Sequence, residues 1–205
     1  MKPLFPVSPA LRRAFTLIEL LVVVSIIALL AAAAYGGYSI MIERGKKTGA
    51  SAAITTVLNA ISQFETDYDR FPQPTSATKG TDCESDTSAA EGLVAVLKGV
   101  DKDQNPKETD YLGEVKDAKK VGTATDARHV DGIYRETDEM IALLDPWGSE
   151  YKVTLDLDGN KKVNNPDQSD PSSASPELHK TAIVYSAGKD RDPATWKDNV
   201  SSWQQ

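Results

Sequence analysis

The apolar residues of this chain are concentrated near its start. No charged residue interrupts the stretch from Leu20 to Ala34, and the apolar character continues to Ile42, which gives 23 residues in all. As a helix, this stretch would be about 35 Å long, whereas the hydrocarbon core of a bilayer is about 30 Å thick. The pattern predicts a transmembrane helix within residues 15–42.

A second apolar pattern follows the basic cluster at residues 44–47. Apolar residues there recur every three or four positions, as they do on one face of an amphipathic helix. These residues are Ala50, Ala53, Ile54, Val57, Leu58, Ile61, Phe64 and Tyr68. Because Pro72 cannot continue a helix, the two patterns together predict one long helix from Thr16 to Asp69. Its second half should lie against a sheet.

The remaining periodic segments are short. A helix is expected in residues 91–98, and alternating apolar residues predict strands at residues 151–155 and 181–185. A hairpin turn at residues 158–160 would lead from the first of these strands into a return strand that begins at residues 162–163. The sequence therefore predicts an α+β fold, in which the long helix packs on a small three-stranded antiparallel sheet.

These patterns divide the chain into three predicted parts. Residues 1–14 form a short basic leader, residues 15–42 form the transmembrane helix, and residues 43–205 form a folded head. Within the head, residues 72–136 are rich in charged and small side chains and are expected to be a variable loop region. Residues 145–205 are expected to hold the sheet and a C-terminal loop.

Charge and cysteine content limit the functions to be considered. The chain of 205 residues has a formal net charge of −7, and loss of the leader, with Lys2, Arg12 and Arg13, would make it −10. No nucleic-acid partner is expected, because such binding depends on cationic side chains that neutralise phosphates. Cys83 is the only cysteine, so no intrachain disulfide can form.

The sequence proposes no catalytic centre. His129 and His179 lie in polar, loop-like surroundings, and Cys83 lies in an acidic loop. No glycine-rich phosphate loop and no cluster with the spacing of metal ligands is present. We therefore do not expect an enzyme.

Glu19 is the unusual residue of the apolar stretch. An ionisable side chain inside a membrane segment costs about 2.5–3.5 kcal/mol, and it usually has a functional partner. The basic start and the small residues at 31–34 also fit a secretory signal peptide that is cleaved there. Composition alone leaves both interpretations open.

The residues around Glu19 carry a more specific signal. The segment Arg12-Arg13-Ala14-Phe15-Thr16-Leu17-Ile18-Glu19-Leu20-Leu21 resembles the cleavage and methylation motif of type IV pilins and type II secretion pseudopilins. The resemblance implies a pilin-like fold, and a prepilin peptidase that cuts between Ala14 and Phe15 and methylates the new amine of Phe15. The family usually has glycine before the cut, where this chain has Ala14.

The resemblance also implies a role for Glu19 in assembly. When helices bundle, its carboxylate would neutralise the N-terminal ammonium on Phe15 of a neighbouring copy, because an unpaired charge in lipid is costly. That pair would fix the register between copies. Residues 15–42 would then be the assembly surface of a homopolymer.

A second motif occurs later in the chain. The segment Asp145-Pro146-Trp147-Gly148-Ser149-Glu150-Tyr151 resembles the turn before the first strand in the major pseudopilin of type II secretion. Without that resemblance, proline and glycine still predict a turn. Trp147 and Tyr151 then predict a buried aromatic corner.

The C-terminal loop, residues 186–199, resembles the loop with which major pseudopilins bind calcium, and Trp203 resembles their terminal tryptophan. The candidate calcium ligands implied by the resemblance are Asp190, Asp192, Thr195 and Asp198. Arg191 and Lys197 depart from the family pattern, which lowers the carboxylate count and alters the turn. A solvated acidic loop without calcium is the alternative.

The predicted function follows from these resemblances. The chain is expected to be a structural subunit of a type II secretion pseudopilus, polymerising through its N-terminal helix to drive protein export across the outer membrane. It would cross the inner membrane once, with its head in the periplasm, and then join a periplasmic filament. Its expected partners are further copies of itself, the prepilin peptidase, minor pseudopilins, the inner-membrane assembly platform and membrane lipid.

Two other functions remain open. A type IV pilin subunit for adhesion, motility or DNA uptake would carry the same N-terminal motif. A membrane-tethered periplasmic domain that binds calcium or another ligand without forming a filament would not need Glu19 for assembly.

Overall fold

The computed structural model describes most of the chain in two compact units, residues 1–43 and 44–205. The described residues are 15–73, 83–86, 92–135, 141–169 and 175–204, with the backbone alone at 33–37, 83–86 and 141. Helix α1 (Leu17–Tyr68) contributes to both units. Its bounds agree within one residue with the helix that the apolar patterns predict.

The described part of the first unit is helical. Its large apolar side chains are exposed, from Phe15 to Leu30, and the buried core contains no described residue before Ala50. No helix in the described part of the chain is at once long enough and apolar enough to cross a membrane.

The second half of α1 forms the centre of the second unit. Its buried residues recur at helical spacing, as predicted, and are Ala50, Ile54, Val57, Ala60, Ile61 and Phe64. They join one hydrophobic core with residues of the sheets and of the short helix α2 (Leu93–Leu97). The helix ends where Asp69 takes a positive φ of 54°, three residues before Pro72.

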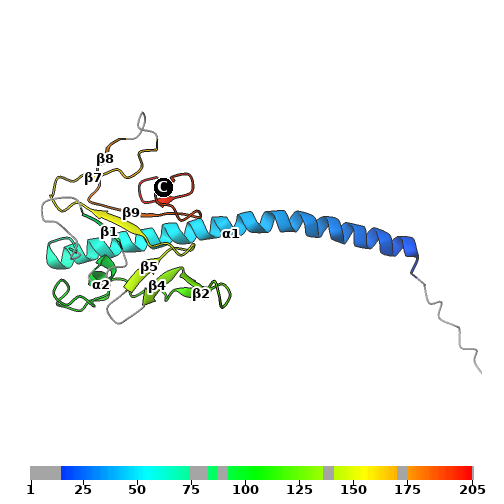
Figure 1. Ribbon diagram of the computed structural model, residues 1–205, viewed down its shortest axis with the longest axis horizontal. Helices are drawn as coiled ribbons and strands as arrows, with labels where there is room; N and C mark the ends of the chain where they lie inside the picture. Colours follow the sequence, from blue (N-terminus) through cyan, green and yellow to red (C-terminus); the bar gives the residue numbers. More distant parts are fainter. Residues whose placement is uncertain (1–14, 74–82, 87–91, 136–140, 170–174, 205) are drawn as a thin grey trace, which may run out of the picture. The chain divides into compact units, whose positions relative to one another are not determined.

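The main sheet has four antiparallel strands in the order β1 (Cys83–Asp86), β6 (Lys152–Leu155), β9 (Ala182–Ser186) and β10 (Val200–Ser201). In the central pair, Val153 lies opposite Val184, and both are buried in the core with residues of α1. Strand β9 lies along the second half of α1 (Figure 1). The structure therefore confirms an α+β fold with the helix packed on antiparallel strands. The predicted number of three strands is wrong.

The predicted hairpin, in which the return strand at residues 162–163 pairs with residues 151–155, is wrong. β7 (Val163–Asn164) pairs with β8 (Glu177–Leu178) and not with β6. Both edges of β6 are already occupied, by β1 and β9. The turn after β6 is built on the buried carboxylate of Asp156, which accepts hydrogen bonds from the N–H groups of Gly159, Asn160 and Lys161.

The prediction of an irregular region between residues 72 and 136 is also wrong in part. It contains β2 (Lys119–Val121) paired with β3 (Arg128–Val130). It also contains β4 (Gly132–Arg135), which pairs with β5 (Ile141–Leu144) beyond the region. The β4–β5 pair forms because Ile133 and Leu143, which lie opposite each other, bury their side chains in the core.

Candidate functional site

The start of α1 is a capping box built from Thr16 and Glu19. The N–H of Thr16 donates to Glu19 Oε2 at 2.9 Å, and the Thr16 hydroxyl donates to the same oxygen at 2.8 Å. In return, the N–H of Glu19 donates to Thr16 Oγ1 at 3.3 Å. Such reciprocal bonds satisfy backbone donors that the first turn of a helix otherwise leaves unpaired.

The capping box gives Glu19 a local role that sequence reasoning missed. The signal was present, because Thr-x-x-Glu before an apolar run is the sequence pattern of such a cap. In the described part of the chain, Glu19 Oε1 accepts no hydrogen bond. One carboxylate oxygen is thus used by the cap, and the other is available for a positively charged group. Ala14 lies outside the described residues, and Phe15 is 75% exposed.

The surface around Glu19 is apolar. Its exposed neighbours on α1 are Leu17, Ile18, Leu20 and Leu21. A continuous apolar surface of this kind indicates contact with lipid or with other apolar helices. The arrangement can therefore hold one carboxylate at a fixed place on an apolar helix and offer it to a cation that arrives with a partner helix.

The second motif, residues 145–151, forms the expected buried corner. Trp147 is 4% exposed and Tyr151 is 1% exposed. Gly148 has a φ of 93°, and a Cβ atom at this position would lie 3.0 Å from the carbonyl oxygen of His129. Glycine is therefore required for both the backbone conformation and the close approach.

Asp145 holds this corner together. Its Oδ1 accepts hydrogen bonds from the N–H groups of Trp147 and Ser149, each at 2.9 Å. Its Oδ2 accepts the hydroxyl of Ser186 in β9 at 2.6 Å. Burial raises the pKa of Asp145, and the hydrogen bonds from Ser186 and from the backbone oppose that shift. The buried carboxylate thus ties the turn to the central sheet.

The C-terminal loop brings three of the four predicted calcium ligands together. Asp198 Oδ2 accepts the N–H groups of Lys189 and Asp190, at 2.6 and 3.0 Å. Asp190 accepts the N–H of Asp192 at 2.9 Å and also the hydroxyl of Thr195. The carboxylate of Asp192 instead closes its own turn, by accepting the N–H of Ala194.

In this arrangement the carboxylates of Asp190, Asp192 and Asp198 accept hydrogen bonds from N–H and hydroxyl groups of the loop itself. The hydroxyl of Thr195, followed by the N–H of Asp192, lowers the pKa of the exposed Asp190. Arg191 has a φ of 62°, a left-handed conformation that glycine adopts more easily. Within the described residues, no group of three or more His, Cys, Asp or Glu side chains is placed to hold a metal ion.

Three aromatic rings attach the C-terminal loop to the sheet. The ring centroids of Tyr185 in β9 and Trp196 are 5.1 Å apart, and those of Tyr185 and Trp203 are 5.9 Å apart. Trp196 and Trp203 also contact each other, with centroids 5.7 Å apart. Contacts of this type typically add about 0.5–1.5 kcal/mol beyond the burial of apolar area. Sequence reasoning noted Trp203 alone.

The comparison with known proteins bears on the N-terminal site. Residues 10–35 match the family model of the prokaryotic N-terminal methylation motif. The match contains Ala14, Phe15 and Glu19, and it supports a type IV pilin-like, membrane-anchored protein of a pilus or secretion system. It is also consistent with processing by a prepilin peptidase and assembly into a pilin-type filament. No curated protein and no solved structure matches the chain.

Proposed function

We propose that this chain is a structural subunit of a type II secretion pseudopilus. The observation that carries the proposal is the methylation motif at residues 10–35, followed directly by a helix with exposed apolar side chains. The buried turn at residues 145–151 and the C-terminal loop, with their resemblance to the major pseudopilin, favour a pseudopilus over other filaments. Polymerisation through the N-terminal helix would drive protein export across the outer membrane.

The proposed assembly begins at the inner membrane. The precursor crosses this membrane once through residues 15–42, with its head in the periplasm, and the prepilin peptidase cuts before Phe15. The ammonium on Phe15 of one copy then pairs with Glu19 of the next copy, whose cap holds the carboxylate in place. Minor pseudopilins and the inner-membrane assembly platform are the expected partners of the growing filament.

Intact mass and N-terminal sequence, measured on membrane-extracted protein, test this biogenesis. Expression with the prepilin peptidase should give a product that begins at N-methylated Phe15, and expression without it should leave the leader in place. An uncut protein in both cases, or cleavage within residues 31–34, would mean an ordinary anchor or a secreted domain, and the proposal would be abandoned.

The alternative within the same class is a type IV pilin subunit for adhesion, motility or DNA uptake. The N-terminal motif favours both, because it is found in both kinds of filament subunit. Deleting the gene distinguishes them, since loss of export supports the pseudopilus and loss of surface filaments supports the pilus. A processed protein that forms no filament would instead support the membrane-tethered ligand-binding domain.

Calcium binding by the loop of residues 186–199 is a separate proposal. A ligand that binds only the folded state raises stability by mass action, so calcium should raise the melting temperature of the full processed chain in detergent. Asp190→Asn should abolish this increase, whereas Asp158→Asn, in an exposed turn elsewhere, should leave it unchanged. An identical melting curve with and without calcium would show that the acidic loop is simply solvated.

A further inference from the structure

The hairpin of β2 and β3, residues 119–130, lies on the surface of the second unit. Its two strands form a sheet of their own, and the turn between them, residues 122–127, is exposed. Val121, at the turn end of β2, is 37% exposed. It is the only large apolar residue exposed among the side chains described from residue 44 onward. One exposed valine is ordinary by itself, so its significance depends on its neighbours.

The neighbours of Val121 are basic. Arg128 lies directly opposite Val121 in the register of the hairpin, and Lys120 precedes Val121 in the chain. Lys119 is paired with Asp131 at 2.9 Å. The side chains of Lys120 and Arg128 form no ion pair within the described structure. The hairpin contains three basic residues and one acidic residue, whereas the processed chain has a net charge of −10. It is thus a basic, partly apolar projection on an acidic protein.

The buried corner around Trp147 joins the hairpin to the start of the second unit. Lys46 Nζ lies 6.0 Å from the ring centroid of Trp147. At the next residue, Gly148, a Cβ atom would lie 3.5 Å from Arg128 Cδ. Lys46 is four residues after Ile42, where the apolar stretch ends, and four residues span at most about 14 Å even when fully extended. Chain connectivity therefore keeps the hairpin near the end of the apolar stretch.

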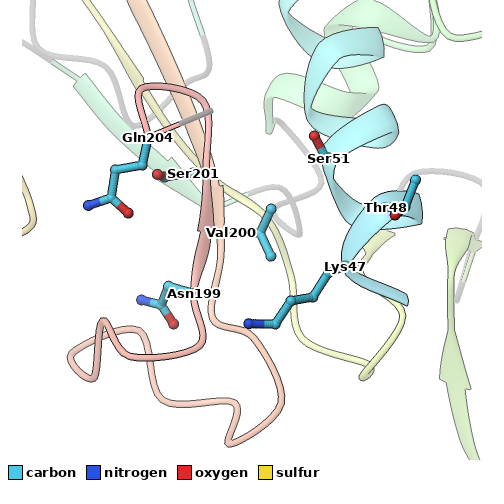
Figure 2. Close-up of a pocket in the computed structure, with 7 residues that line it drawn as sticks. All are labelled: Lys47, Thr48, Ser51, Asn199, Val200, Ser201 and Gln204. Atoms are coloured by element: carbon cyan, nitrogen blue, oxygen red, sulfur yellow. The ribbon is translucent and has the colours of Figure 1, made fainter. Parts of the chain in front are cut away.

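The basic residues at the start of the second unit are partly occupied by the head itself. Lys47 lines a pocket of about 370 Å³ with the C-terminal segment, and its amino group is directed toward Asn199 (Figure 2). Lys46 lies over the aromatic ring of the buried corner. Arg44 is exposed, so it adds to the basic groups that the hairpin offers to a partner at this end of the unit.

The chemistry of the hairpin fits the surface of an anionic lipid bilayer. Val121 and Arg128 share one face because opposite residues of paired strands point the same way, and Lys120 lies on the other face. The turn end therefore has one apolar side chain with a cation on each side. Long basic side chains bind phosphate groups with their charged ends while their stems lie along apolar surface.

We propose that the turn end of this hairpin docks on anionic lipid headgroups, with Lys120 and Arg128 at the phosphates and Val121 at the edge of the hydrocarbon. The proposal rests on the proposed membrane insertion of residues 15–42, and it adds a second attachment of the head to the bilayer. The rest of the head is acidic and is repelled by an anionic surface. The hairpin would therefore determine which side of the head faces the lipid before a copy joins the filament.

Quenching by a nitroxide on the lipid headgroup tests the docking. The full processed chain, with Cys83→Ser and Ala124→Cys, carries a fluorophore on residue 124, in the exposed turn of the hairpin. It is reconstituted sparsely in vesicles of phosphatidylcholine alone or of an equimolar mixture with phosphatidylglycerol. Quenching should be stronger in the anionic vesicles, and high salt should remove the difference because it screens exposed charges.

Two double variants test the role of the cations. Lys120→Gln with Arg128→Gln should lower the ratio of docked to undocked heads in anionic vesicles by about fivefold for each cation removed, since a basic residue near such a surface contributes about 1 kcal/mol. Lys161→Gln with Lys180→Gln changes the net charge equally at exposed sites elsewhere, and it should dock like the unchanged chain. Both double variants should keep the melting temperature.

The outcomes separate this proposal from the proposed function. Inserted chains with equal quenching in both kinds of vesicle, or an equal loss in both double variants, would overturn the docking and leave the filament standing. Quenching that rises with the number of copies per vesicle, and not with phosphatidylglycerol, would identify a second copy as the partner and overturn the lipid. Chains that an alkaline carbonate wash removes from the vesicles would remove the proposed membrane insertion, and the docking with it.

Discussion

Replacing Glu19 with leucine should abolish filament assembly and leave membrane insertion and cleavage before Phe15 intact. Leucine extends the apolar stretch, so insertion is not impaired. Without Glu19, the ammonium on Phe15 of each neighbouring copy stays unpaired in an apolar environment, which costs several kcal/mol. Electron microscopy of the filaments and the intact mass of the membrane-extracted protein measure the two effects separately.

Two further variants distinguish the charge of Glu19 from its role in the cap. Glu19→Gln keeps the hydrogen-bonding side chain that a capping box needs but removes the charge, so it should also fail to assemble. Thr16→Val removes the capping hydroxyl and keeps the charge, so filaments should still form with a helix less stable by about 1 kcal/mol. Normal filaments from a cleaved Glu19→Leu protein would contradict the assembly role.

Replacing Asp145 with alanine should destabilise the second unit strongly. The variant leaves the Ser186 hydroxyl and the N–H groups of Trp147 and Ser149 without their buried acceptor. Losses of this kind amount to about 3 kcal/mol, which corresponds to a melting temperature lower by about 6–12 °C for a domain of this size. Thermal unfolding of the full processed chain in detergent, followed by tryptophan fluorescence, measures the change.

Asp145→Asn is the matched control, because its amide oxygen can still accept from the backbone and its amide nitrogen can donate to Ser186. It should be clearly more stable than Asp145→Ala. If the two variants melt at the same temperature, the hydrogen bonds of Asp145 do not hold the turn to the sheet.

The burial of Asp145 also predicts that the free energy of unfolding of the second unit depends on pH. Burial raises the pKa of Asp145 in the folded state, so the protonated form is favoured by folding. The resulting stabilisation is complete below the ordinary pKa of aspartate and is lost as the pH rises through the raised value. Subtracting the pH profile of Asp145→Asn from that of the unchanged chain isolates this contribution, which should fall with rising pH.

The sequence by itself determined the parts of this protein that depend on local patterns. Apolar spacing and Pro72 placed α1 within one residue of its observed bounds. Alternation placed β6 and β9, and the turn residues around Trp147 predicted the buried corner. The residues that form the N-terminal site are consecutive in the chain, so the methylation motif could be recognised without the fold. The capping box is also a local feature, because Thr16 and Glu19 are only three positions apart in the chain.

Only the tertiary structure decided which distant segments pair. β1 has the sequence Cys-Glu-Ser-Asp and β10 has two residues, so neither carries an alternation that would mark it as a strand. Both become strands because β6 and β9 offer them free edges. The hydrogen bond from Ser186 to Asp145 likewise joins residues 41 positions apart. Its chemistry arises from packing, since no local pattern in either segment specifies the other.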